Sequence, residues 1–117
     1  MKIAKIYPGS DGDSHFEDID VEFIPGPGVD HLAAIPDVNG VQIRRTPAGA
    51  VWGFHRADCR KYMIILEGRI EIGVGDGTKR TFGAGDVLIV EDTTGRGHTT
   101  RVIGDEDRIC IDIKLRS

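Results

Sequence analysis

Residues 49–68, GAVWGFHRADCRKYMIILEG, contain part of a possible metal site. Their single histidine, His55, stands where a transition metal would need two or three protein ligands, and Lys61 stands where a carboxylate would serve. A second histidine, His98, follows the glycine-rich segment TTGRG. Imidazoles exchange protons near neutral pH, whereas a lysine ammonium repels cations and attracts anions. The residues therefore indicate either a depleted metal site or a metal-independent acid–base site.

Composition limits the classes of protein to consider. The chain has 117 residues, 39% of them hydrophobic, and a formal net charge of −4, which suits one domain with one core. No basic stripe is present for nucleic acid, and no apolar run approaches the length of a membrane span or a signal sequence. Cys59 and Cys110 lack metal-type spacing and read as free thiols. We expect a cytoplasmic protein with no nucleic-acid or membrane partner.

The regular spacing of short apolar runs predicts an all-β fold. Sixteen glycines and five prolines separate these runs about every ten residues, as in sandwiches and barrels. The expected strands are 2–7, 21–24, 41–46, 51–54, 62–66, 69–74, 79–82, 87–90, 98–103 and 108–115. Between them we expect a solvated acidic loop at 11–18 and a helical turn at 29–34. Gly68 and residues 75–77 are typical of tight hairpins.

Two strands alternate clearly between apolar and other side chains. Residues 69–74 place Ile70, Ile72 and Val74 on one face, and residues 108–115 do the same with three isoleucines and Leu115. Each of these strands is expected to present one apolar face to the core.

The spacing around His55 resembles the first motif of the cupins. That motif runs glycine, five residues, His-x-His, three or four residues, glutamate, six residues, glycine. This chain has Gly49 and His55 in place, then Ala57 instead of the second histidine, Lys61 instead of the glutamate, and Gly68 at the right distance. The spacing of the motif is retained, while two of its three metal ligands are replaced.

The second cupin motif is matched less closely. Gly85 opens it and His98 closes it, but residues 91–93 replace its Pro-x-Gly and the loop is two residues longer. The resemblance runs from about residue 41 to 115 and implies a double-stranded β-helix, the cupin jelly-roll barrel. We therefore expect a single cupin domain over 1–117, with N-terminal strands and loops at 1–40 and the cupin core at 41–115.

The cupin register implies which side chains face the barrel. It directs His55, Ala57, Lys61 and His98 into the barrel mouth, with Met63 and Ile65 on the wall below Lys61. Three of these, His55, Lys61 and His98, are the candidate catalytic residues. The alternative for each residue is a structural role without catalysis, since an imidazole can bond to the backbone and a lysine can extend to solvent.

Three further residues are candidates for binding a substrate. Val41, Ile43 and Arg45 share one strand face, so if the two aliphatic side chains point to the core, Arg45 reaches the cavity rim and can clamp a carboxylate. Met63 would line the wall, and Trp52 could stack on a substrate or pack structurally.

Fold alone does not fix function, because cupins include enzymes and non-enzymatic binders. The first hypothesis is a pocket for a small anionic or carbonyl-bearing metabolite, with metal-independent isomerase, lyase or cyclase chemistry and no cofactor. The alternative is a metal-dependent dioxygenase or isomerase, in which His55 and His98 bind Fe, Mn, Ni or Zn with a carboxylate from Asp58, Glu91 or Asp92. A binding module without turnover is the third hypothesis.

A homodimer is also expected. The apolar face of Tyr62, Ile64 and Leu66 needs cover, and a small sandwich exposes two sheet edges. By cupin habit, the first strand would pair with a neighbour in the second copy.

Overall fold

The computed structural model describes residues 1–116 and contains twelve strands. They are β1 (Lys2–Pro8), β2 (Ser14–Asp20), β3 (Ile24–Pro25), β4 (His31–Leu32), β5 (Val38–Thr46), β6 (Val51–His55), β7 (Lys61–Glu67), β8 (Arg69–Gly73), β9 (Lys79–Gly83), β10 (Val87–Val90), β11 (His98–Ile103) and β12 (Arg108–Leu115). The all-β prediction is confirmed. Within residues 1–116, no helix is long and apolar enough to cross a membrane.

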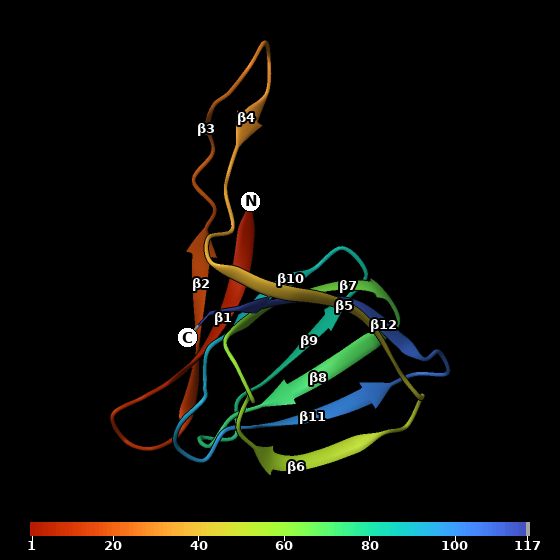
Figure 1. The fold of residues 1–117 in the computed structure, drawn as a ribbon. Coiled ribbons are helices and arrows are strands. Elements are labelled where there is room, and N and C mark those ends of the chain that lie inside the picture. The colour runs from red at the N-terminus through yellow and green to blue at the C-terminus, as the bar shows by residue number, and fades with distance from the viewer. Residues whose placement is uncertain (117) are drawn as a thin grey trace.

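Two sheets pack face to face to form the body of the molecule (Figure 1). The larger sheet has the strand order β2-β1-β10-β7-β12-β5, and the smaller has the order β6-β11-β8-β9. The pair β1 and β10 is parallel, and the other neighbours are antiparallel. A third, two-stranded element, β3-β4, projects from the body. We call residues 21–37, which carry it, the arm.

The hydrophobic core lies between the two sheets. The alternation in β8 correctly predicts its buried residues, since Ile70 and Ile72 are at most 1% exposed. Leu88 of β10 and Ile65 of β7 face them from the larger sheet, both fully buried. The core therefore uses the inner face of each sheet, as in other β-sandwiches.

The tight β7–β8 turn depends on Gly68. Its φ is +78°, and a Cβ there would lie 2.5 Å from the carbonyl oxygen of Asp107. Only glycine combines that backbone conformation with so close an approach. The predicted hairpin at this position is confirmed.

The N-terminal third differs from the sequence predictions in three places. Residues 14–18 of the expected acidic loop belong to β2 (Ser14–Asp20), which pairs with β1 along its whole length. The expected strand 21–24 is limited to Ile24 in β3, and the expected helical turn at 29–34 contains β4. Pairing with β1 satisfies the backbone of β2 despite its polar sequence, and local propensity could not show this. Because β1 lies between β2 and β10, it has no free edge for pairing with a second copy.

The orientation of β12 is the opposite of the prediction. Arg108, Cys110 and Asp112 form the buried row, while the three isoleucines Ile109, Ile111 and Ile113 lie on the outer face and are partly exposed. Two inward contacts offset part of the cost of burying these groups: Arg108 Nη2 donates to Thr46 Oγ1 at 2.8 Å, and Asp112 pairs with Arg44 at 2.9 Å. Nε of Arg108 is buried without a hydrogen-bond partner. Partnered polar groups are tolerated in a core, so alternation alone did not reveal the buried face.

Candidate functional site

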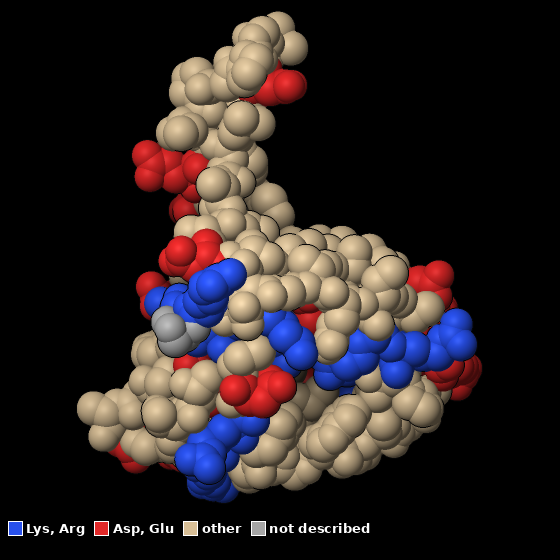
Figure 2. Space-filling view, in the orientation of Figure 1, with Lys and Arg blue, Asp and Glu red and all other residues tan. Residues whose placement is uncertain are grey.

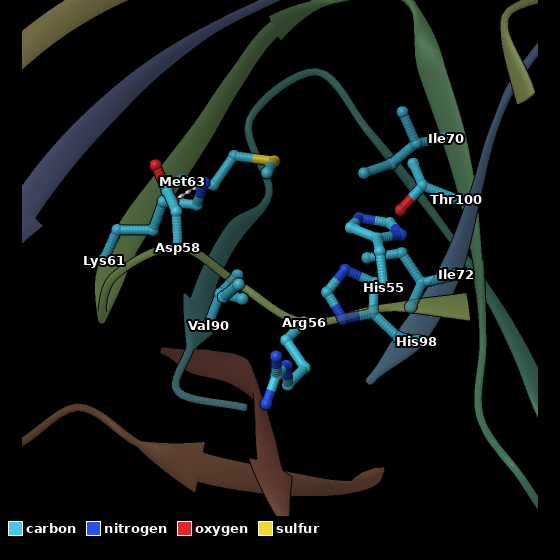
Figure 3. Close-up of a pocket in the computed structure, with 11 residues that line it drawn as sticks. His55, Arg56, Asp58, Lys61, Met63, Ile70, Ile72, Val90, His98 and Thr100 are labelled. Carbon is cyan, nitrogen blue, oxygen red and sulfur yellow. Dashed lines mark ion pairs between the residues drawn. The ribbon is translucent and has the colours of Figure 1, made fainter. Parts of the chain in front are cut away.

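A cavity of about 240 Å³ opens at one end of the barrel, between the two sheets (Figure 3). Its volume suits a compact ligand, since sites for drug-sized molecules span roughly 300–1,000 Å³. Both sheets and the β6–β7 connection contribute to the lining, which consists of His55, Arg56, Ala57, Asp58, Lys61, Met63, Ile70, Ile72, Val90, His98 and Thr100.

His98 is held by a buried carboxylate. Its Nδ1 lies 2.5 Å from Oδ2 of Asp92, and the hydroxyl of Ser14 donates to the same oxygen at 2.7 Å. Asp92 is 0% exposed and Ser14 only 1%. A carboxylate in this position fixes the imidazole orientation, favours a proton on Nδ1, and stabilises the imidazolium when Nε2 takes up a proton. His98 is therefore oriented as a proton acceptor through Nε2.

Nδ1 of His55 is also engaged by a hydrogen-bond acceptor, but this acceptor is a neutral backbone carbonyl and not a carboxylate. Its Nδ1 lies 2.8 Å from the carbonyl oxygen of Gly53, which can only accept, so Nδ1 carries the proton. The centroids of the His55 and His98 rings are 4.6 Å apart, with an angle of 55° between the rings. Both rings line the cavity, with each Nδ1 engaged, and Nε2 is the atom of each ring that remains for a ligand.

Glycine and backbone contacts hold the two histidines together. Gly97, with a φ of +82°, directly precedes His98, and a Cβ on it would overlap the carbonyl of His55. The amide of Ala57 donates to the carbonyl of Asp92 at 3.0 Å, which joins the β6–β7 connection to the loop before β11. The glycine-rich segment noted in the sequence thus allows the close approach of β6 to this loop.

Glu91 anchors the same loop to the larger sheet. Its carboxylate forms ion pairs with Lys5 at 3.1 Å and with Arg60 at 2.5 Å. Burial acts to raise the pKa of Glu91, but hydrogen bonds from Lys5 and Arg60, together with their charges, hold it below the usual value. Glu91 therefore serves as a charged anchor for the loop that carries Asp92.

Lys61 lies on the opposite side of the cavity from the histidines (Figure 3). Its side chain is 14% exposed, and Nζ lies 3.6 Å from Oδ1 of Asp58. Burial acts to raise the pKa of Asp58, but the charge of Lys61 and hydrogen bonds keep it below its usual value. The ammonium remains within the lining, where it can attract an anionic group of a ligand.

Arg45 lies outside this cavity, contrary to the prediction. It shares the outer face of β5 with Val41 and Ile43, which are 64% and 75% exposed and do not point to the core. The neighbouring Arg44 faces inward and pairs with Asp112. The premise that the aliphatic residues of β5 face the core was wrong, because the inner face of this edge strand is the polar one.

The remaining predicted binding residues are divided between the lining and its edge. Met63 is 6% exposed and lines the cavity. Trp52 is 39% exposed and is not part of the lining, although its ring centroid is 6.4 Å from that of His55. Trp52 is therefore positioned beside the cavity, next to His55, and not on its wall.

The residues that support His98 were not predicted from the sequence. Ser14 was assigned to a solvated loop, and Asp92 was considered only as a metal ligand or a loop cap. Asp92 precedes His98 by six residues, the one sequence signal that joins them, whereas Ser14 lies 78 residues away from Asp92. Only the pairing of β2 with β1 brings Ser14 to the site.

Comparison with solved structures agrees with the cupin resemblance. The chain is similar to a Cupin 2 conserved barrel domain protein from Salinispora arenicola, with 24% identity, a TM-score of 0.52, and coverage of 74% of this chain and 72% of that one. It is also similar to the cupin domain of Schizosaccharomyces pombe Cnp3, with 20% identity, a TM-score of 0.53, and coverage of 88% and 73%. Neither protein-family models nor curated proteins give a match. The chain is a protein of the cupin fold, a jelly-roll barrel.

Many cupins bind a metal ion, which requires several donor side chains placed around one point. Within residues 1–116, no group of three or more His, Cys, Asp or Glu side chains is placed to bind a metal ion. The cavity offers two imidazoles, while the nearby carboxylates of Asp58, Glu91 and Asp92 already pair with a lysine, an arginine and His98. A cationic Lys61 completes the lining. These residues do not fit a transition metal, which requires at least three donors.

Proposed function

We propose that the cavity binds a compact anionic or carbonyl-bearing metabolite and that His98 and His55 carry out metal-independent acid–base chemistry on it. One observation carries the proposal: both imidazoles line one cavity with Nδ1 engaged and Nε2 left for a ligand. The reaction classes that need only proton transfer are isomerisation, elimination and cyclisation. The cupin fold is compatible with each of them but selects none.

His98 and His55 would have different roles. We assign the base to His98, because the Asp92 carboxylate orients its ring and leaves Nε2 to the cavity. His55 would act as the acid in its imidazolium form, in which Nδ1 stays on the carbonyl of Gly53 and Nε2 carries the proton that is transferred. With ring centroids 4.6 Å apart, the two can serve as base and acid on one small substrate. Lys61, across the cavity, would hold the carboxylate or stabilise the enolate that forms.

Binding and proton transfer can be tested together with pyruvate, a compact 2-oxo acid. In NMR titrations we expect pyruvate to shift the signals of His55, Lys61 and His98, and in D2O we expect the protein to accelerate deuterium incorporation into the pyruvate methyl group. Lys61→Met should weaken binding about tenfold, and His98→Gln should abolish the exchange while binding persists. Arg45→Met is the matched control, because Arg45 is a cationic residue outside the cavity.

Absence of binding by pyruvate and by malonate at 10 mM, roughly the weak limit for a specific site, would contradict the proposal. Binding without exchange would favour the third hypothesis, a binding module without turnover. The metal-dependent alternative is tested separately by elemental analysis of the purified protein. Stoichiometric iron, manganese, nickel or zinc that is lost in His55→Ala would favour it. A cytoplasmic location also remains a prediction.

A further inference from the structure

A second cation lies directly behind the wall of the cavity. Arg108, the first residue of β12, is 1% exposed and belongs to the inward row of that strand. Nη1 of its guanidinium lies 3.8 Å from Sδ of Met63, a side chain that lines the cavity. One methionine side chain therefore separates this buried charge from the space that a ligand would occupy.

The guanidinium of Arg108 lacks the carboxylate that a buried charge normally has. Nη2 donates to the hydroxyl of Thr46 at 2.8 Å, Nη1 has the thioether of Met63 as its partner, and Nε is buried without one. A thioether is a weak acceptor, and a hydroxyl carries no charge. Among residues 1–116, no carboxylate forms an ion pair with Arg108. Burial of a charge without a counterion is strongly unfavourable.

The buried carboxylate of the same strand, Asp112, is engaged by other residues. It pairs with Nε of Arg44 at 2.9 Å and accepts a hydrogen bond from Nε2 of Gln42 at 3.2 Å. Burial and then the positive charge of Arg44 lower the pKa of Arg108, while the charge of Asp112 acts in the opposite direction. The charge of Arg108 is therefore only partly compensated within the chain.

Lys61 and Arg108 approach Met63 from opposite ends of the barrel. Lys61 and Met63 are alternate residues of β7, so their side chains share one face and their Cα atoms lie about 7 Å apart. In the register of β7 with β12, Lys61 lies opposite Lys114, at the end of β12 remote from Arg108. The cavity thus has one cation in its lining and a second cation next to it, deeper in the barrel.

Met63 is a side chain that can move aside. It is unbranched and has three rotatable bonds, so it adapts to a changed neighbour more readily than a branched core residue does. A ligand oxygen placed where Sδ of Met63 stands would lie close to Nη1 of Arg108. A carboxylate there would accept charge-assisted hydrogen bonds, and its planar shape suits a guanidinium.

The distribution of surface cations favours the approach of anions to the same region. In Figure 2, Lys and Arg gather in a band across the body, while the arm has none of either residue in its sequence. In the common orientation of Figures 1 and 2, this band lies between β5 of the larger sheet and β6 of the smaller one. A local concentration of positive charge attracts anions even to a chain whose formal net charge is −4.

We propose that Arg108 is a second anion subsite of the cavity and that the ligand is a short dicarboxylate, with one carboxylate on Lys61 and the other on Arg108 in the place of Sδ of Met63. This subsite rests on the proposed function and narrows its substrate class from a compact anion to a dianion. Extended succinate measures about 6 Å between its outermost oxygens, close to the spacing of Lys61 and Met63 along β7. His55 and His98, which line the same cavity, would face the carbon atoms between the two carboxylates.

Succinate and butyrate test the subsite, because butyrate has a methyl group in place of one carboxylate. By NMR titration we expect the unmodified protein to bind succinate at least about tenfold more tightly than butyrate. Arg108→Met removes the charge and keeps an unbranched side chain, a kind of change that protein interiors tolerate. It should lower the affinity for succinate to that for butyrate and leave the affinity for butyrate unchanged. Arg45→Met, the same substitution on the outer face of β5, is the matched control and should preserve the preference.

A second measurement needs no variant. Saturating succinate, but not butyrate, should shift the guanidinium ¹⁵N signals of Arg108 and the methyl signal of Met63, because only the dianion displaces the thioether. Equal affinity for the two acids, a preference for succinate that persists in Arg108→Met, or unchanged Arg108 signals at saturation would overturn the subsite. So would the absence of succinate binding at about 10 mM. Pyruvate that binds and exchanges its methyl protons, in a protein without a preference for succinate, would overturn the subsite alone and support the proposed function.

Discussion

Nδ1 of His98 lies 2.5 Å from Oδ2 of Asp92, a carboxylate that is 0% exposed. Ser14 bonds to the same oxygen. One buried carboxylate thus connects the first residue of β2 with the first residue of β11, two positions 84 residues apart in the sequence. This arrangement determines which nitrogen of His98 meets a ligand.

Long-range ¹H–¹⁵N NMR correlations should show the proton on Nδ1, and not on Nε2, for the neutral forms of His98 and His55. The physical reason is that Asp92 and the carbonyl of Gly53 only accept hydrogen bonds. Asp92→Ala should lower the free energy of unfolding by about 2 kcal/mol, because it leaves buried donors without an acceptor. His55 should keep its tautomer in that variant. A proton on Nε2 of His98 in the unmodified protein would contradict the assignment.

Lys61→Glu should convert the cavity into a metal site. The substitution removes a cation and adds a carboxylate to the two imidazoles, which completes a set of three donors. By isothermal titration calorimetry we expect Zn²⁺ to bind at least about tenfold more tightly than to the unmodified protein, since one added charged ligand contributes over 1.4 kcal/mol. Lys79→Glu, an exposed change on β9, is the control. Equal affinity in Lys61→Glu and the unmodified protein would refute this prediction.

Asp112→Asn should destabilise the barrel at neutral pH. Burial acts to raise the pKa of Asp112, but the charges of Arg44 and Lys61 hold it below its usual value of 3.8. A lowered pKa stabilises the fold above that value, and the stabilisation is lost as pH falls through the folded-state pKa. Urea unfolding at pH 7 should show a loss of about 2 kcal/mol, since Arg44 is left without its partner but keeps some contact with solvent.

The difference between the unmodified protein and Asp112→Asn should shrink as pH falls below 3.8. Asp18→Asn is the control, because the ion pair of Asp18 with Arg80 is exposed and should contribute less than about 0.5 kcal/mol. A difference for Asp112→Asn that is the same at pH 7 and at pH 3 would show that charge is not its cause.

Gly97→Ala should destabilise the protein far more than Gly77→Ala. Both glycines have a positive φ, +82° and +91°, so alanine is strained at either position by about 1 kcal/mol. A Cβ at Gly77 meets nothing within 4 Å, whereas one at Gly97 would overlap the backbone of His55. We expect a further loss of about 2 kcal/mol in Gly97→Ala, with shifted NMR signals for His55. Equal thermal unfolding of the two variants would disprove the close approach.

Glycine spacing and apolar runs gave most of the body of the fold. Strands β5 to β12 were all predicted, because short apolar segments separated by glycine turns have few other ways to bury themselves. The polar β2 was missed, since its backbone is satisfied only by pairing with β1. The arm was also misread: its two short strands pair with each other, with Ile24 opposite Leu32, where a helical turn was expected.

The sequence by itself determined the jelly-roll class and the nearness of His55, Lys61 and His98, because the cupin frame of glycines places these positions at one end of the barrel. Only the tertiary structure decided the inward face of β12 and β5. An alternating strand has two faces, and partners from other strands, such as Arg44 for Asp112, decide which is buried. The contact of Ser14 with Asp92 is likewise tertiary, because it joins residues 78 apart that no local preference relates.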